Sequence, residues 1–104
     1  MKLLERSPSK LTRHDENLVN GLQVLSDTSR FRIFKLLLNK RRELCVSEIA
    51  HELGISSSAV SQHFRIFELS DMVDKKRYGQ KICYALKTND PLVESLSLIV
   101  KRKH

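Results

Sequence analysis

Small polar side chains on one face of a predicted helix are the residues whose types and spacing best suit a defined chemistry. They are Ser57, Ser58, Ser61, Gln62 and Arg65. No acidic residue joins them before Glu68. Hydroxyl and amide groups at the N-terminal end of a helix can exchange hydrogen bonds with base edges in the major groove of DNA. The pattern favours a recognition helix; the alternative is a solvated face, which more often carries mixed Glu and Lys pairs.

Basic residues around a predicted hairpin tip form a second group. Lys75, Lys76, Arg77 and Lys81 crowd this tip, and only Asp74 opposes them. Lysines also protect an exposed edge strand from aggregation, which is the alternative explanation of the group. Directly after a recognition helix, however, a basic hairpin suits contact with the phosphates of DNA.

The two groups together give a predicted DNA-binding set. The residues expected to meet base edges are Ser57, Ser58, Ser61 and Gln62. The residues expected to hold the DNA backbone and the groove flanks are His63, Arg65, Lys76, Arg77, Gln80 and Lys81, and Ser56 completes the set. Few long side chains leave this helix, so part of the specificity is expected to come from DNA shape.

The two cysteines do not make a disulfide framework. Cys45 is interpreted as a small, half-buried apolar residue rather than a metal ligand. Cys83 lies on the strand face opposite Ile82 and Tyr84, and we expect it to be accessible. A redox pair of Cys45 with Cys83 remains an alternative, because the sequence does not give the distance between them.

Other reactive residues point to no catalytic chemistry. His14 and His51 are expected on helix surfaces, and His63 is expected to hydrogen-bond a phosphate or a neighbouring group rather than a metal. No acid pair, nucleophile–base pair or glycine-rich phosphate loop occurs at a usable spacing. The sequence predicts no enzyme, no metal site and no cofactor.

A helix–turn–helix is predicted to position the polar face. Apolar residues at i, i+3, i+4 and i+7 from Val46 predict a first helix ending at Leu53. Gly54 stands where a left-handed residue stops a helix, and Ser56 suits the N-cap of the next one. Ile55 and Val60 are spaced for a hydrophobic staple. The second helix is expected to turn Val60, Phe64 and Phe67 inward.

Three further helices and a hairpin, with a possible short strand, complete the predicted fold. Thr12 with Asp15 predicts the start of a helix that buries Leu18, Leu22 and Leu25. A wide apolar arc predicts a central helix over 28–39, and residues 43–46 either form a short strand or continue directly into a helix. Alternation of apolar and polar residues predicts strands at 72–77 and 81–86, joined by a tip at 78–80 with a left-handed Gly79. Asp90 followed by Pro91 predicts the last helix.

These elements predict a mainly α fold with a small β-hairpin (α+β), of winged helix-turn-helix type. The order is α-α-α-α-β-β-α, with a possible short strand before the third helix. With 104 residues the chain is predicted to hold a basic arm over 1–11 and one domain over 12–104. The net charge of +7 favours an anionic partner, nucleic acid rather than membrane, since no apolar run is long enough to span a bilayer. Because the N-terminus has no signal-peptide core, an intracellular, cytoplasmic location is expected.

The apolar stripes of the first and last helices exceed what so small a core needs. We interpret them as a dimer interface, and packing within one chain is the competing explanation. The interface residues expected are Leu18, Leu22, Leu92, Leu96 and Ile99.

Several motifs in register resemble the ArsR/SmtB family of repressors, over half the chain from Leu25 to Leu86. They are Leu25-Ser26-Asp27-Thr28-Ser29-Arg30 before Ile33, Glu43-Leu44-Cys45-Val46-Ser47-Glu48-Ile49, Leu53-Gly54-Ile55-Ser56, Val60-Ser61-Gln62-His63-Phe64, Met72-Val73, Gly79, Tyr84 and Leu86. The resemblance implies a homodimer that reads an inverted-repeat operator in double-stranded DNA, and repression relieved by a ligand, often a metal. The sequence does not name the inducer.

The chain departs from the metal sites that the resemblance implies. A thiolate pair would need cysteines at 45 and 47, and Ser47 replaces the second. A zinc-type site would need Asp-x-His at the start of the last helix, where Asp90 is followed by Pro91 and Leu92. We therefore expect a dimeric, sequence-specific regulator, a repressor, that lacks these sites. The alternatives are a protein-interaction module and a thiol-redox-sensing repressor that uses Cys45 and Cys83.

Overall fold

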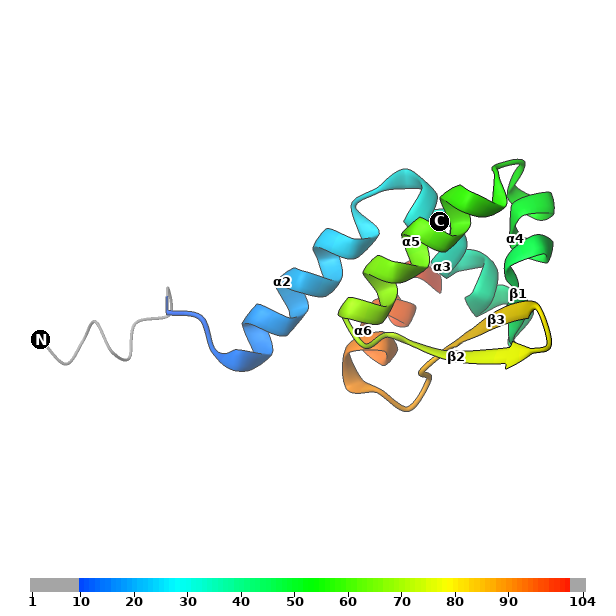
Figure 1. Cartoon of the computed structure of the whole chain (residues 1–104). Coiled ribbons are helices and arrows are strands. Elements are labelled where there is room, and N and C mark those ends of the chain that lie inside the picture. Colours follow the sequence, from blue (N-terminus) through cyan, green and yellow to red (C-terminus); the bar gives the residue numbers. More distant parts are fainter. Residues whose placement is uncertain (1–9, 102–104) are drawn as a thin grey trace, which may run out of the picture.

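The computed structural model describes residues 10–101, which hold five helices and three strands (Figure 1). The elements are α2 (Arg13–Leu25), α3 (Thr28–Lys40), β1 (Leu44–Cys45), α4 (Val46–Leu53), α5 (Ser57–Leu69), β2 (Val73–Tyr78), β3 (Lys81–Leu86) and α6 (Pro91–Lys101). The predicted winged helix-turn-helix order is confirmed. Residues 43–46 satisfy both expectations, because β1 runs directly into α4. Most of the predicted arm, residues 1–9, lies outside the described residues.

Side-chain caps begin the helices at the predicted residues. Thr12 and Asp15 form the reciprocal capping box at the start of α2. The Ser56 hydroxyl accepts the backbone N–H of Ala59 at 3.0 Å, and the Asp90 carboxylate accepts that of Val93 at 3.1 Å. Each cap satisfies an N–H that the helix itself leaves free.

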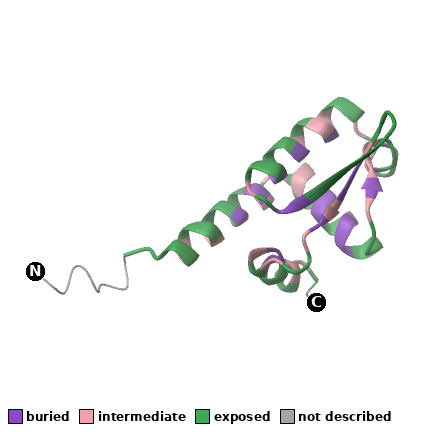
Figure 2. Cartoon of the chain, turned by 60° about the horizontal axis from the view of Figure 1, so that its bottom comes forward, coloured by how far each residue is buried: buried purple, intermediate pink, exposed green. Residues whose placement is uncertain are grey.

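Helix α2 buries only part of the face predicted, because Leu18 and Leu25 pack half-buried against the core and Leu22 does not. Gly21 and Val24 are buried, whereas Leu22 is 46% exposed. The reason is that α2 packs against both α3 and α6, and Gly21 lies directly under Leu92 and Leu96 of α6. In Figure 1 the N-terminal half of α2 projects away from the other helices. Figure 2 shows that half as almost entirely exposed.

The three strands form one antiparallel sheet in the order β1-β3-β2. Tyr78 pairs with Lys81, so the hairpin turn is Gly79-Gln80, one residue shorter than predicted. Gly79 has a φ of 62°, which confirms the left-handed turn residue. Cys83 is fully buried, so its predicted accessibility is wrong. The central position of β3 explains this, since β1 pairs beside it and sets Cys45 opposite Cys83.

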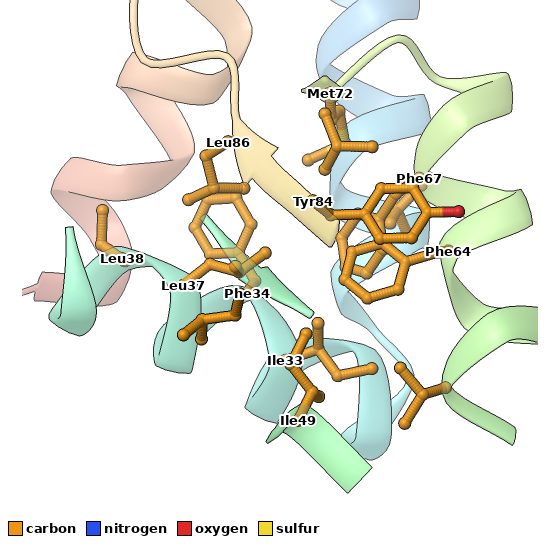
Figure 3. Close-up of a cluster of buried hydrophobic side chains, with 14 of the residues drawn as sticks. Ile33, Phe34, Leu37, Leu38, Ile49, Phe64, Phe67, Met72, Tyr84 and Leu86 are labelled. Carbon is orange, nitrogen blue, oxygen red and sulfur yellow. The ribbon is translucent and has the colours of Figure 1, made fainter. Parts of the chain in front are cut away.

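Aromatic side chains of α5 and the sheet form the middle of the core (Figure 3). Phe64 stacks on Tyr84 with ring centroids 3.8 Å apart and planes at 4°. The ring centroid of Phe67 lies 5.5 Å from that of Phe64, and both phenylalanines are fully buried. Ile33 and Phe34 of α3 are fully buried in the same cluster, which confirms α3 as the central helix. This cluster holds α5 and the sheet in a fixed mutual position.

Among the helices of residues 10–101, none has the length and apolar character needed to cross a membrane.

Candidate nucleic-acid interface

The turn between α4 and α5 has the geometry that the sequence predicts. Gly54 ends α4 in the left-handed region at φ 67°. The N–H of Ile55 donates to the carbonyl of Ala50 at 3.1 Å, which closes the turn. The Arg32 guanidinium donates to the carbonyl of Leu53 at 3.1 Å and so ties the end of α4 to α3. The direction of α5 is therefore set by backbone contacts on both sides of the turn.

Helix α5 divides cleanly into an inner and an outer face. Val60, Phe64 and Phe67 are fully buried, as predicted. The outer residues Ser57, Ser58, Gln62 and Arg65 are exposed, together with the cap Ser56, and Ser61 is half-buried. Since the inner face is locked in the core, the outer face is a rigid row of hydroxyl, amide and guanidinium groups.

His63 lies to one side of this outer face and is half-buried. The pKa of Asp27, the N-cap residue of α3, lies below its ordinary value, chiefly because its carboxylate accepts a hydrogen bond from the backbone N–H of Arg30. His63 makes a smaller electrostatic contribution to the same shift.

The hairpin of β2 and β3 carries the basic residues predicted for the wing. Lys75, Lys76, Arg77 and Lys81 are all exposed, and in the described part of the chain no carboxylate forms an ion pair with them. Asp74 is instead 4.0 Å from the Lys87 ammonium, which also contacts Asp71. The positive charge of the wing is therefore left unneutralised.

Strand register divides the wing cations between the two faces of the sheet. Lys75 pairs with Tyr84 and Arg77 with Ile82, so these cations share the sheet face that packs on α5. Lys76 pairs with Cys83, on the opposite face. The wing thus presents cations on both faces of the hairpin.

A cleft of about 360 Å³ lies between α5 and the wing. Its lining residues are Cys45, Val46, Ser47, Ser57, Ser61, Gln80, Lys81 and Ile82. The cleft brings together Ser57 and Ser61 from α5 with Gln80 and Lys81 from the wing. No carboxylate lines it within the described residues. The sequence prediction did not include Cys45, Ser47 or Ile82, because only the pairing of β1 with β3 brings them beside α5.

Cys45 and Cys83 form a disulfide between β1 and β3, with Cα atoms 3.7 Å apart. Cys45 also precedes α4, and its backbone N–H donates to the Glu48 carboxylate at 3.0 Å. That hydrogen bond, followed by one from the Arg42 guanidinium, holds the pKa of Glu48 below its ordinary value. The sequence left the Cys45–Cys83 pair open as an alternative.

The donors at positions 45 and 47 do not fit a thiolate metal site. The Cys45 sulfur is bonded to Cys83, and position 47 offers only a serine hydroxyl, which is a poor ligand for soft metals. Across residues 10–101, no group of three or more His, Cys, Asp or Glu side chains is placed to hold a metal ion.

The sequence matches a known family model over its central half. Residues 27–75 match the model described as the arsR family of bacterial regulatory proteins. A "Transcriptional repressor SmtB homolog" from Synechocystis is 34% identical over 74 residues, which cover 71% of this chain and 54% of that protein. The matched part therefore spans about half the length of this relative.

Two further relatives have solved structures. HlyU from Vibrio cholerae, named a transcriptional activator, is 27% identical over 93 residues, covering 86% of this chain and 84% of that protein. Its structure has a TM-score of 0.75 at 24% identity, covering 86% of this chain and 94% of that chain, and this likeness shows the fold. The transcriptional repressor PagR of Bacillus anthracis has a TM-score of 0.67 at 27% identity, covering 83% and 94% of the two chains.

Proposed function

The chain belongs to the ArsR family of winged-helix transcriptional regulators, none of them enzymes, and we propose that it binds double-stranded DNA sequence-specifically as a homodimer and represses transcription. Two of its similar relatives are named repressors and one is named an activator. A protein can repress transcription simply by occupying a promoter, which requires no protein surface beyond the DNA-binding interface. We therefore propose repression rather than activation. Such a regulator would act in the cytoplasm, where bacterial DNA lies.

One observation carries the proposal: the outer face of α5 and the basic wing meet at a shared cleft. A helix of about 10 Å diameter with its side chains fits the major groove, and a hairpin beside it then reaches the phosphates flanking that groove. Ser57 and Ser61 line the same cleft as Lys81, so a duplex that receives α5 would also meet the wing. The unneutralised cations of the wing favour such a polyanion.

Within this interface the side chains are proposed to divide base reading from backbone contact. Ser57, Ser58, Ser61 and Gln62 would meet base edges, since they stand on the outer face of α5. Arg65, Lys76, Arg77, Gln80 and Lys81 would contact phosphates and groove flanks, with Ser56 next to them at the helix N-terminus. We propose only a supporting part for His63, because it is half-buried to one side of the outer face.

A second copy of the chain is proposed to cover the exposed apolar residues of α2 and α6. Val19 and Leu22 on α2 are 42% and 46% exposed, and Leu98 and Ile99 on α6 are 70% and 61% exposed. An isolated helix of 13 residues is marginal in water, and the N-terminal half of α2 is almost entirely exposed among residues 10–101 (Figure 2). Of the residues expected at this interface, Leu96 packs inside the chain at 1% exposure, and Leu18 and Leu92 are half-buried. Leu22 and Ile99 are the two best placed to meet a partner.

Selection of duplexes from a random library tests this function. The protein should enrich an inverted repeat whose half-sites are centred about one helical turn apart, roughly 10 base pairs. An Arg77→Ala variant should bind the enriched duplex more weakly, and Arg13→Ala, a matched charge change on the outlying part of α2, should bind it as the wild type does. If no sequence is enriched and the protein shows no measurable affinity for DNA, the winged helix is a protein-interaction module instead.

A further inference from the structure

The Cys45–Cys83 disulfide stands at the junction of the two parts of the proposed DNA-binding surface. Cys83 belongs to β3, two residues after Lys81 of the wing. Cys45 ends β1 and is followed at once by α4, the first helix of the helix–turn–helix. The bond therefore joins the wing covalently to the helical reading unit, at the wall of the cleft that both parts line.

The two sulfur-bearing residues differ in their access to solvent. Cys83 is fully buried, whereas Cys45 is half-buried and lines the cleft between α5 and the wing. A small reagent that enters this cleft therefore meets Cys45 first. When the bond is open, the Cys45 sulfur stands at the N-terminus of α4, where the helix dipole favours the thiolate, the reactive form of cysteine.

We propose that Cys45 and Cys83 form a reversible thiol–disulfide switch, oxidised by peroxides and reduced by small dithiols, that sets how tightly the protein holds DNA. The coupling to DNA rests on the proposed function; the thiol chemistry does not. Regulators of chromosomal DNA work in a compartment where thiols are kept reduced, and disulfides there are usually transient or redox-sensing.

Oxidation and reduction both begin at the accessible sulfur. The Cys45 thiolate attacks one oxygen of hydrogen peroxide, the O–O bond breaks, and the departing hydroxide takes a proton to become water. The Cys83 thiol then attacks the Cys45 sulfenic acid, the S–S bond forms and a second water leaves. In the reverse direction a dithiol thiolate attacks the Cys45 sulfur, Cys83 leaves as a thiolate and is protonated, and the second thiol of the reagent closes its own disulfide and releases Cys45.

The closed disulfide is the form expected to bind DNA more tightly. Without the bond, β1 holds the sheet through the backbone pairing of only Leu44 and Cys45. A cross-link keeps Gln80 and Lys81 in position relative to α5 before DNA arrives, and such preorganisation lowers the entropy lost on binding.

The same coupling must act in both directions. If oxidation raises the affinity for DNA, bound DNA must favour the oxidised state by the same factor. Because Cys45 lines the cleft that DNA would cover, bound DNA should also slow the reaction of reduced Cys45 with iodoacetamide.

The experiment compares peroxide-treated and dithiothreitol-treated full-length protein in two independent measurements. Alkylation with iodoacetamide followed by peptide mass spectrometry should find no modified cysteine after peroxide, and modification of Cys45 well before Cys83 after dithiothreitol. Affinity for the selected duplex should be at least about fivefold higher in the oxidised form, a typical size for coupling between two sites.

The control variant combines Cys45→Ser with Cys83→Ala and should bind DNA equally after either treatment. Serine is a good N-cap for α4, and alanine avoids placing a hydroxyl at the buried position, so circular dichroism should report an intact fold. Failure of peroxide to close the bond, or of dithiothreitol to open it, would overturn the proposal. Equal or reversed affinities of the two forms would overturn it as well. If neither form binds any duplex, the proposed function and its coupling to the thiols fail, while the alkylation pattern still decides the thiol chemistry.

Discussion

Tyr84 shows how a single side chain links the sheet to α5, the helix proposed to read DNA. Its ring stacks on Phe64, and its hydroxyl donates to the Glu68 carboxylate at 3.2 Å, so both contacts are made to α5 (Figure 3). Burial, with the nearby Glu68 charge second, raises the pKa of Tyr84 to about 12. The sequence identified Tyr84 as a strand residue but contained no signal for its partner, because Glu68 lies 16 positions away in the chain.

Tyr84 should make the protein sensitive to alkaline pH. The folded state holds the phenolic proton more tightly than the unfolded chain, whose tyrosine has its ordinary pKa of 10.0. The free energy of unfolding is therefore undiminished below pH 10 and falls as the pH rises from 10 toward 12, by at most about 3 kcal/mol from this group. Tyr84→Phe should lower stability at neutral pH by about 1 kcal/mol and should flatten this alkaline loss. Urea unfolding at several pH values measures the stability at neutral pH and its loss at alkaline pH. If the variant lost as much stability between pH 10 and 12 as the wild type does, Tyr84 would not be the group responsible.

Gln62 and Arg77 should differ in what they contribute to DNA binding. Gln62→Ala removes an amide from the outer face of α5, so it should relax preference at one base pair by about 1–3 kcal/mol. Arg77→Ala should weaken binding to all sequences alike and reduce the salt slope by about one. Affinities for a set of single-base variants of the selected duplex distinguish the two patterns, and the reverse pattern would reject this division of roles.

At the level of single elements, Gly21 is the position where α2 and α6 approach most closely. A Cβ at Gly21 would stand 2.9 Å from a Leu92 methyl and 3.0 Å from a Leu96 methyl. Leu96 is buried at 1% exposure. A side chain at position 21 would therefore have to displace methyl groups of two leucines on α6, although glycine itself weakens a helix by about 1 kcal/mol relative to alanine.

Gly21→Ala should destabilise the protein even though alanine is the better helix former. The helix gains about 1 kcal/mol from alanine, whereas overpacking against Leu92 and Leu96 costs about 1–3 kcal/mol, so we expect a net loss of about 1 kcal/mol. Asn20→Ala, at the exposed neighbouring position of α2, is the matched control and should be neutral or slightly stabilising. Thermal unfolding of both variants measures the difference, and a Gly21→Ala protein more stable than wild type would contradict this packing.

Element boundaries could be predicted from the sequence because their signals are local. Thr12, Ser56 and Asp90 cap their helices through residues three positions away, and Gly54 and Gly79 provide left-handed turns. The inward face of α2 could be predicted only in part, because apolar spacing does not reveal which residues meet α6. The burial of Cys83 and its bond to Cys45 depend on the pairing of β1 with β3, which joins residues 38 positions apart. The outer face of α5 could be predicted because Val60, Phe64 and Phe67 recur at helical spacing and leave the polar residues on the other side.

At the scale of the whole molecule, the proposed homodimer would cover the exposed apolar residues of α2 and α6. Ile99→Asp places a charge on this surface without disturbing the core, since Ile99 is already 61% exposed. The variant should be monomeric in sedimentation equilibrium where the wild type is dimeric. It should also bind the full inverted repeat at least about tenfold more weakly, because two linked half-sites are no longer engaged together. Asn39→Asp, an exposed charge change on α3, should leave the dimer intact; if both variants behave as the wild type, this surface is not the interface.

The central claim is that α5 reads bases while the wing holds phosphates, and salt-dependent competition measures it most directly. The measurement is the affinity for the selected duplex and for a scrambled duplex over a series of salt concentrations. The account predicts affinity for the selected duplex at least about a thousandfold higher than for the scrambled one. It also predicts that a plot of log affinity against log salt concentration falls steeply, with a slope of about −0.9 for each phosphate contacted. Equal affinities for the two duplexes, or an affinity indifferent to salt, would contradict it.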